Sequence, residues 1–472
     1  MFDLKKINLG KDEAEQDERL KEYFLKTESY EKIRNGEKTI VLGRKGSGKS
    51  AIFTLLEEEY SNKGDIVIKI TPDQYSWGAL KDYQEQGILP EQAHTNAWKL
   101  TLLSAIVWKL NEEGKIKEDS KLKKYYEYMK DSFSPQRDNW FINLVKKVKK
   151  MLGGIKTQWL SFEDSSPTPT PLRIIGELQE LIIKENCSNQ NVRIIIDRLD
   201  DSWDASKESK NLLIGLLKAN NQINSLLNGN LKSIIFLRSD IYDNLIFDDK
   251  DKLRQNEETL RWDNKELKEV ITERVRVSLN LENMGEEEIW NTLFSDKLFR
   301  SSANVEKYII DRTFKRPRDI ISFVRFCLEI AIRNNHNKIE NDDTHLAEEE
   351  SYSKSKYEDL IIEYQKQIPF IQELLDSFTI CMHKMSQKEL LQHLELFFEG
   401  RTLKIDPRVM INILFIMGVM GVKKYGRAGV KQRGGIGFYY YYDDPSTRPL
   451  SHDEYYIHPS LRYYLNIKEK RT

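Results

Sequence analysis

Cysteine is scarce in this sequence, and its placement excludes two kinds of site. The chain has 472 residues but only three cysteines, Cys187, Cys327 and Cys381. They are too far apart for a zinc site and form no disulfide framework. This usage is typical of a reducing compartment, so we expect a cytoplasmic protein. The seven histidines are scattered as well, and we expect no transition-metal site.

The sequence also lacks a long hydrophobic run and an excess of charge. No stretch approaches the roughly 20 apolar residues of a membrane helix, and the first residues are acidic where a signal peptide would be apolar. Charged residues make up 32% of the chain, yet the formal net charge is only −1. We therefore expect a soluble protein without a membrane span, in which any basic surface is local.

Strand-like and helix-like segments alternate over the first half of the chain. Five short apolar segments predict strands, at residues 38–43, 65–73, 191–201, 232–240 and, more weakly, 257–263. Helical patterns lie between most of them. This alternation predicts an α/β fold, a parallel sheet covered by helices on both faces. The composition changes at about residues 113–170, which indicates an insertion into the α/β core that ends in a flexible linker.

The second half of the sequence predicts helices followed by a hairpin. Expected helices at 369–380, 386–398 and 406–418 precede a segment rich in glycine and tyrosine. Three helices followed by a two-stranded wing is the order of a winged-helix domain. We therefore predict three domains: an α/β core at 1–264, a helical lid at 265–345 and a winged-helix domain at 346–472.

Residues 43–50 form the motif with the clearest chemistry. The segment GRKGSGKS matches G-x-x-x-x-G-K-[ST] between a predicted strand and a predicted helix. Its glycines let backbone N–H groups turn toward a phosphate, Lys49 can reach the outer phosphates, and the Ser50 hydroxyl can ligate Mg²⁺. A chance match is the alternative, which the flanking elements disfavour. The predicted ATP-binding residues are Gly43, Arg44, Lys45, Gly46, Ser47, Gly48, Lys49, Ser50 and Ala51.

A second motif, VRIIIDRLDD, predicts the acidic half of such a site. Its apolar residues bring Asp197 to the carboxyl edge of a buried strand, where it can hold Mg²⁺. Asp200 or Asp201 can then orient the attacking water as general base. The alternative is that these two residues only cap the next helix.

These motifs resemble those of one group of bacterial ATPases. The segment IIIDRLDD resembles the hhhhDGhDD/E pattern of AAA+ and STAND P-loop ATPases. The opening, up to GRKGSGKSA, and the ending YYIHPSLRYYL are similar to FunZ-like and KAP-like ATPases with a winged-helix tail. KAP members usually have membrane helices, so the FunZ-like branch is favoured. One departure is Arg198, which stands where relatives commonly have Gly or Ala.

The resemblance also implies roles for several arginines. It assigns Arg238 to a γ-phosphate sensor at the end of the fourth strand. A second sensor in the lid would be Arg318 or, as second choice, Arg316. Both could instead form ordinary surface ion pairs. Arg254 and Arg261 lie where AAA+ homo-oligomers can supply an arginine finger, and we assign that role to neither.

The predicted wing carries the most suggestive basic cluster. It consists of Lys423, Lys424, Arg427, Lys431 and Arg433. Such a hairpin can bind the backbone of duplex DNA, although winged helices also bind proteins. The preceding helix, PRVMINILFIM, has few polar side chains to offer base edges, which disfavours sequence-specific recognition.

The sequence thus predicts an ATP-hydrolysing switch. The resemblance implies a sensor or assembly platform in bacterial defence against phage or mobile DNA, acting with a partner protein or effector. One alternative is a nucleotide-gated scaffold that hydrolyses little ATP. Another is a DNA-loading ATPase that uses the basic wing.

Overall fold

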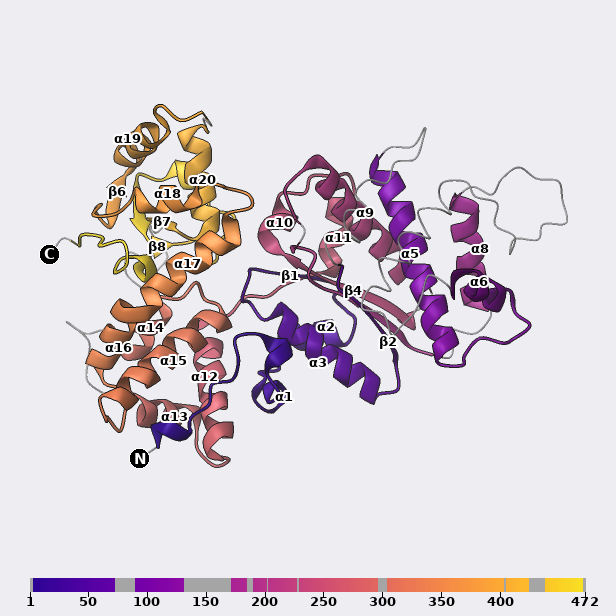
Figure 1. Ribbon diagram of the computed structural model, residues 1–472, viewed down its shortest axis with the longest axis horizontal. Coiled ribbons are helices and arrows are strands. Elements are labelled where there is room, and N and C mark those ends of the chain that lie inside the picture. The colour runs from indigo at the N-terminus through magenta and orange to yellow at the C-terminus, as the bar shows by residue number, and fades with distance from the viewer. Residues whose placement is uncertain are drawn as a thin grey trace, which may run out of the picture. The chain divides into compact units, whose positions relative to one another are not determined.

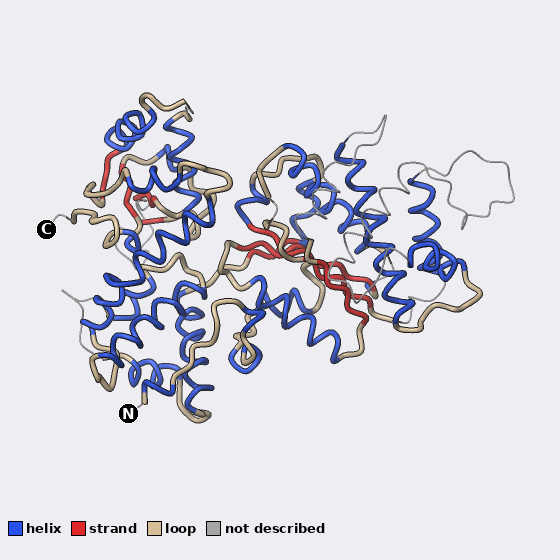
Figure 2. The backbone as a smooth tube through the Cα atoms, viewed as in Figure 1, coloured by secondary structure: helices blue, strands red, loops and turns tan. Residues whose placement is uncertain are grey.

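The described part of the chain forms two compact units. The computed structural model describes residues 3–72, 90–130, 171–184, 190–201, 203–226, 229–295, 304–402, 405–423 and 438–469 (Figures 1 and 2). The α/β unit comprises Lys26–Arg44 and Lys49–Leu260, and the helical unit comprises Met1–Leu25, Lys45–Gly48 and Arg261–Thr472. Four residues in the middle of the GRKGSGKS segment thus belong to the helical unit, whereas the residues on either side belong to the α/β unit.

A five-stranded parallel sheet is the centre of the α/β unit. Its strands are β1 (Ile40–Gly43), β2 (Ile66–Ile70), β3 (Val192–Ile196), β4 (Leu231–Arg238) and β5 (Glu257–Thr259), in the order β2-β3-β4-β1-β5. Apolar residues make up most of β1 to β4, and this composition suits the strands of a parallel sheet covered by helices. All five strands were predicted. Their carboxyl ends align, so Gly43 lies beside Arg238 in the register of β1 and β4.

Helices cover both faces of this sheet (Figure 1). Those of the α/β unit are α2 (Glu28–Arg34), α3 (Lys49–Asn62), α5 (Pro90–Glu112), α6 (Lys121–Met129), α8 (Pro171–Lys184), α9 (Lys207–Asn224), α10 (Ser239–Asp243), α11 (Lys250–Leu253) and the turn η6 (Arg254–Asn256). Close packing joins α5 to α9: a Cβ on Gly215 would lie 2.7 Å from the Cβ of His94. Helix α6 lies in the predicted insertion, yet its Leu122 and Tyr125 are part of the core.

The helical unit begins with the N-terminal turns and continues after β5. Its first elements are η1 (Leu4–Lys6), η2 (Ala14–Gln16), α1 (Leu20–Tyr23), α12 (Asn264–Leu279), α13 (Glu286–Leu293), α14 (Val305–Ile310), α15 (Pro317–Arg333), α16 (Asn341–Ala347), the π-helical turn η8 (Glu348–Tyr352) and α17 (Ser353–Tyr364). Pro317 stands at the start of α15, where its missing N–H is not needed. Phe323 of α15 stacks on Tyr352 in the core, with ring centroids 4.1 Å apart.

The last part of the helical unit combines helices with a small antiparallel sheet. Its elements are α18 (Ile371–Asp376), β6 (Lys384–Ser386), α19 (Gln387–Phe398), α20 (Pro407–Met417), β7 (Met420–Lys423), β8 (Phe438–Tyr439), η9 (Pro449–Ser451), β9 (Glu454–Ile457) and η10 (Pro459–Leu461). The strand order is β6-β9-β7-β8. The three helices lie within the predicted ranges, whereas β6 and β9 were not predicted.

Of the helices that the structure describes, none is both long enough and apolar enough to span a bilayer.

Candidate functional site

The phosphate loop, residues 43–50, joins β1 to α3 at the carboxyl edge of the sheet. Gly46 and Gly48 have φ angles of 82° and 97°, which L side chains rarely adopt. A Cβ on Gly46 would also lie 3.1 Å from the Cβ of Arg318. Both glycines are therefore required by the backbone. Lys49, Ser50 and Ala51 form the first turn of α3.

Lys49 is a buried cation held by the loop itself. Lys49 is only 9% exposed, and its Nζ donates to the carbonyls of Gly43 (2.9 Å) and Arg44 (3.1 Å). Burial lowers the pKa of Lys49, while Asp200 and Asp197 act in the opposite direction. An anionic ligand would relieve this desolvation by pairing with the ammonium group. The loop thus fits a phosphate chain.

Ser50 and Asp197 are brought together as the two motifs predict. The Ser50 hydroxyl donates to Oδ2 of Asp197 at 3.1 Å, and Asp197 follows directly after β3. Burial raises the pKa of Asp197, partly offset by the backbone N–H of Arg198 and by Lys49. Hydroxyl and carboxylate oxygens are ligands that Mg²⁺ accepts. In the loop, the buried Ser47 Oγ has no hydrogen-bond partner, so a further polar ligand has a place there.

Arg238 ends β4 and is held by a carboxylate that sequence reasoning missed. Its Nε and Nη2 donate to Asp240 at 3.0 and 2.7 Å. Its Nη1 lies 3.8 Å from Oδ2 of Asp200. The guanidinium group is therefore buried beside the acidic motif, with one edge fixed. No sequence motif marks Asp240, which lies in the short helix α10.

Asp200 and Asp201 do not cap α9. The N-cap of that helix is Ser206, whose side chain accepts from the backbone N–H of Ser209. Asp200 is partly buried and near Arg238, whereas Asp201 is exposed in the turn after β3. The capping alternative is thus excluded, and Asp200 is the better placed of the two for a role at the site.

Arg198 adopts a backbone conformation that favours glycine. Its φ angle is 60°, in the left-handed region, and its residue is exposed. An L residue with a Cβ pays a steric cost there. A glycine would adopt this conformation without that cost.

The two lid arginines differ in their surroundings. Arg316 is 5% exposed and is bound to Asp319 (3.2 Å), Glu363 (3.3 Å) and the carbonyl of Lys45 (2.6 Å). Arg318 is only partly buried, and its side chain lies against Gly46 of the phosphate loop. The guanidinium of Arg316 is thus committed to its protein partners.

Arg254 and Arg261 are both exposed.

Of the five basic residues predicted for the wing, the structure describes only Lys423. Lys423 pairs with Glu454 at 2.9 Å, and Lys384 pairs with the same carboxylate at 2.6 Å. These two lysines lower the pKa of Glu454 to about 2. Lys423 therefore shares a single carboxylate with Lys384. The others, Lys424, Arg427, Lys431 and Arg433, lie outside the described residues.

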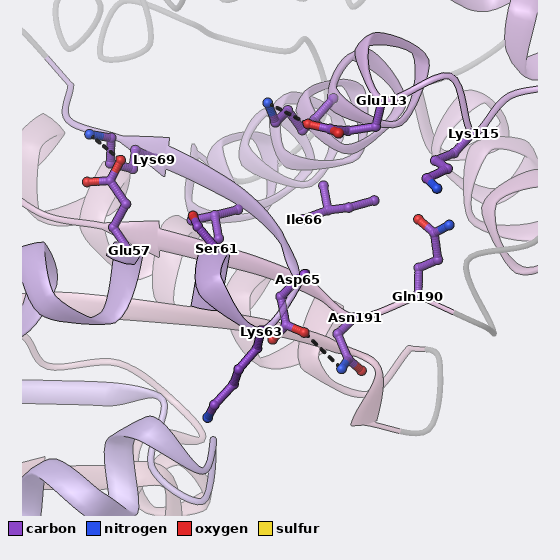
Figure 3. Close-up of a pocket in the computed structure, with 13 residues that line it drawn as sticks. Glu57, Ser61, Lys63, Asp65, Ile66, Lys69, Glu113, Lys115, Gln190 and Asn191 are labelled. Carbon is purple, nitrogen blue, oxygen red and sulfur yellow. Dashed lines mark hydrogen bonds and ion pairs between the residues drawn. The ribbon is translucent and has the colours of Figure 1, made fainter. Parts of the chain in front are cut away.

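A separate pocket of about 830 Å³ opens near the amino end of β2 (Figure 3). Lys69 pairs with Glu57 there at 2.7 Å, and Asn191 donates to Asp65 at 3.0 Å. Because its position is opposite to the carboxyl edge, this pocket does not include the phosphate loop. Its charges are largely paired, and we assign no ligand to it.

Comparison with known proteins identifies one family over a limited part of the chain. Residues 265–361 match the family of the FunZ-associated C-terminal helical domain. The chain is 26% identical to the transposon gamma-delta 80.3 kDa protein of Escherichia coli (strain K12), over 97% of this chain and 67% of that protein. It is 29% identical to the allergen Alt a 2 of Alternaria alternata, over 38% of this chain and 94% of that protein.

Two solved structures from Aeropyrum pernix are similar at low identity. The ORC1 protein in complex with DNA is 10% identical, with a TM-score of 0.39 and coverage of 97% of this chain and 96% of that one. The ORC2 protein is 12% identical, with a TM-score of 0.42 and coverage of 95% and 96%. The parallel order β2-β3-β4-β1-β5 and the GRKGSGKS loop between β1 and α3 give the α/β unit the fold of a P-loop nucleotide-binding core.

Proposed function

We propose that this protein is a Mg²⁺-dependent ATPase that acts as a molecular switch. The observation that carries this proposal is the 3.1 Å contact between Ser50 and Asp197, beside the buried Lys49 at the carboxyl edge of the sheet. A P-loop site needs all three groups: a cation for the phosphates, a hydroxyl and a carboxylate for the metal.

Each residue of the site has a proposed role. Lys49 and the loop N–H groups hold the phosphates, and Ser50 and Asp197 hold Mg²⁺, which when bound neutralises charge on the outer phosphates. Asp200 orients the attacking water, and Asp201 is the second candidate for that role. Arg238 and Arg318 respond to the γ-phosphate as sensors.

The direct test is ATP turnover by the purified chain. We expect Mg²⁺-dependent hydrolysis that falls about 100-fold in Lys49→Ala, because that change removes charge stabilisation from the transition state. Lys63→Ala is the matched control, since Lys63 is exposed beyond the far end of α3. Tight ATP binding without turnover would refute hydrolysis and leave binding standing.

A nucleotide-gated scaffold is the second candidate, and Arg198 motivates it. Many related ATPases place a glutamate directly after the metal aspartate, and here Arg198 occupies that position in a left-handed conformation. If this scaffold is correct, wild-type turnover should be no higher than that of the Asp197→Asn/Asp200→Asn double variant. A clear excess in the wild type would rule it out.

We further propose that the switch is cytoplasmic, works with a separate effector protein and takes part in defence against phage or mobile DNA. The match of residues 265–361 to a FunZ-associated domain supports a FunZ-like assignment, and the similar E. coli protein is named for a transposon. Co-purification from an infected host should recover a partner with the wild type and lose it with Lys49→Ala. Assembly into a homo-oligomer can be measured by light scattering with and without ATP.

The alternative proposal is that this protein is a DNA-loading ATPase. In that case the region of α19, α20 and β7 would act as a winged helix that binds duplex DNA. Charge reversal at Lys423, Lys424 and Arg427 should then abolish duplex binding and flatten its dependence on salt. Unchanged binding in that variant would reject this alternative.

A further inference from the structure

Three consecutive carbonyl groups of the phosphate loop accept hydrogen bonds from the helical unit. The carbonyl of Lys45 accepts from Nη1 of Arg316 at 2.6 Å. The carbonyl of Gly46 accepts from the backbone N–H of Arg318 at 3.4 Å. The carbonyl of Ser47 accepts from Nε1 of Trp262 at 2.9 Å. We call these three contacts the carbonyl clamp, and all of its residues belong to the helical unit.

Peptide geometry makes the clamp relevant to phosphate binding. In a trans peptide, the C=O of one residue and the N–H of the next point in opposite directions. Fixing the carbonyls of residues 45–47 therefore directs the N–H groups of Gly46, Ser47 and Gly48 away from the clamp. These are N–H groups of the kind that a P-loop turns toward an anion. Since both glycines permit many backbone conformations, the loop itself does little to hold this arrangement.

The donors of the clamp are themselves held in place. Arg316 is bound by Asp319 and Glu363, and Asp319 also accepts from Nζ of the buried Lys356 at 2.8 Å. Lys356 pairs with Asp359 as well, so three carboxylates surround the two cations, and Arg316 has little freedom to leave the carbonyl. Trp262 directly precedes Asp263, the N-cap of α12, whose capping box fixes the local backbone.

We propose that Arg316 and Trp262 are positioning residues that preorganise the phosphate loop for the diphosphate part of a nucleotide. This inference rests on the proposed nucleotide binding. Neither side chain needs to touch the ligand. Each holds a carbonyl so that the neighbouring N–H groups are directed toward the anion before it arrives, which removes an ordering penalty from binding.

Trp262→Phe is the sharpest test, because it removes the N–H donor and keeps an aromatic ring. We expect the Kd for Mg-ADP and for a non-hydrolysable ATP analogue to rise about three- to tenfold, the range for one lost hydrogen bond. The Kd for AMP, which lacks the diphosphate, should not change. Arg316→Lys, which keeps the charge but not the fork, should act in the same direction.

Trp290→Phe is the matched control, since Trp290 is a buried tryptophan of α13 in the core of the same unit. It should leave both nucleotide affinities unchanged. Equal weakening by Trp290→Phe, or an unchanged Kd in Trp262→Phe, would overturn the inference.

Hydrogen exchange separates this inference from the proposed function. Without nucleotide, the amides of Gly46–Gly48 should exchange faster in Trp262→Phe than in the wild type or in Trp290→Phe. Unchanged exchange would overturn the clamp whether or not ATP binds. Failure of the wild type to bind any nucleotide would overturn the proposed function, while exchange would still report on the clamp.

Discussion

Arg198 shows at the scale of a single residue how backbone strain can be tested. Its left-handed φ of 60° costs a residue with a Cβ about 1–2 kcal/mol, while glycine loses about 0.5–1 kcal/mol to chain entropy. We therefore expect Arg198→Gly to raise the free energy of unfolding by roughly 0.5 kcal/mol. Urea unfolding would measure this change.

Arg198→Val is the matched contrast, because a β-branched residue tolerates the left-handed region worst. It should lower the free energy of unfolding by about 1 kcal/mol or more. Equal stability of the Gly and Val variants would contradict the strained conformation.

Asp197 provides the second test at residue scale. Its buried carboxylate lowers the stability of the fold but is proposed to bind Mg²⁺. Its folded pKa is raised, so the ionised form destabilises the fold, and this penalty sets in as pH rises through the unfolded pKa of about 3.9. Asp197→Asn should therefore unfold at higher urea concentration than the wild type at neutral pH. The same change should weaken Mg²⁺-dependent ATP binding more than tenfold, because a ligand is lost.

The pH dependence of binding provides the check. Protons compete with Mg²⁺ at Asp197, so binding by the wild type should weaken as pH falls toward the raised pKa. Asp197→Asn should show a flatter pH profile than the wild type. A parallel decline in both proteins would place the titrating group elsewhere.

At the scale of elements, the start of α15 depends on a buried network of charges. Burial alone would raise the pKa of Asp319, but Arg316 and Lys356 lower it overall. The resulting stability is present above the unfolded pKa and is lost as pH falls through the folded pKa. Asp319→Asn leaves two buried cations without this partner, and we expect a loss of about 3 kcal/mol.

Thermal unfolding at pH 7 and in mild acid would measure that loss. Asp311→Asn is the control, because Asp311 pairs with Lys307 on the exposed face of α14 and should change stability little. A loss below about 0.5 kcal/mol in Asp319→Asn would contradict the network.

Sequence patterns predicted those elements whose signal is local. Four strands stand out as apolar runs, and the spacing of the GRKGSGKS motif locates Lys49 and Ser50 without any knowledge of the fold. Strands β6 (KMS) and β9 (EYYI) were missed because neither is a run of aliphatic residues like those that mark β1 to β4. Trp262 and Arg316 were missed as clamp residues because they lie 215 and 271 positions from the carbonyls that they hold.

At the scale of the whole molecule, a net charge of −1 hides local contrasts that decide what the surface can bind. Glu454 pairs with both Lys384 and Lys423, the latter at the end of β7. If the basic hairpin binds duplex DNA, Glu454→Gln removes the carboxylate that pairs with both lysines and makes them more available to phosphates. Affinity should then rise several-fold at low salt, and the salt slope should steepen by up to about two units.

Glu395→Gln is the control for this last prediction, because it makes the same change in net charge at an exposed position of α19. Fluorescence anisotropy with a labelled duplex, measured over a salt series, would compare the two variants. A gain confined to Glu454→Gln assigns the effect to the paired lysines, since a long-range effect of net charge would appear in both. Absence of duplex binding in both variants would exclude this surface as a DNA-binding site.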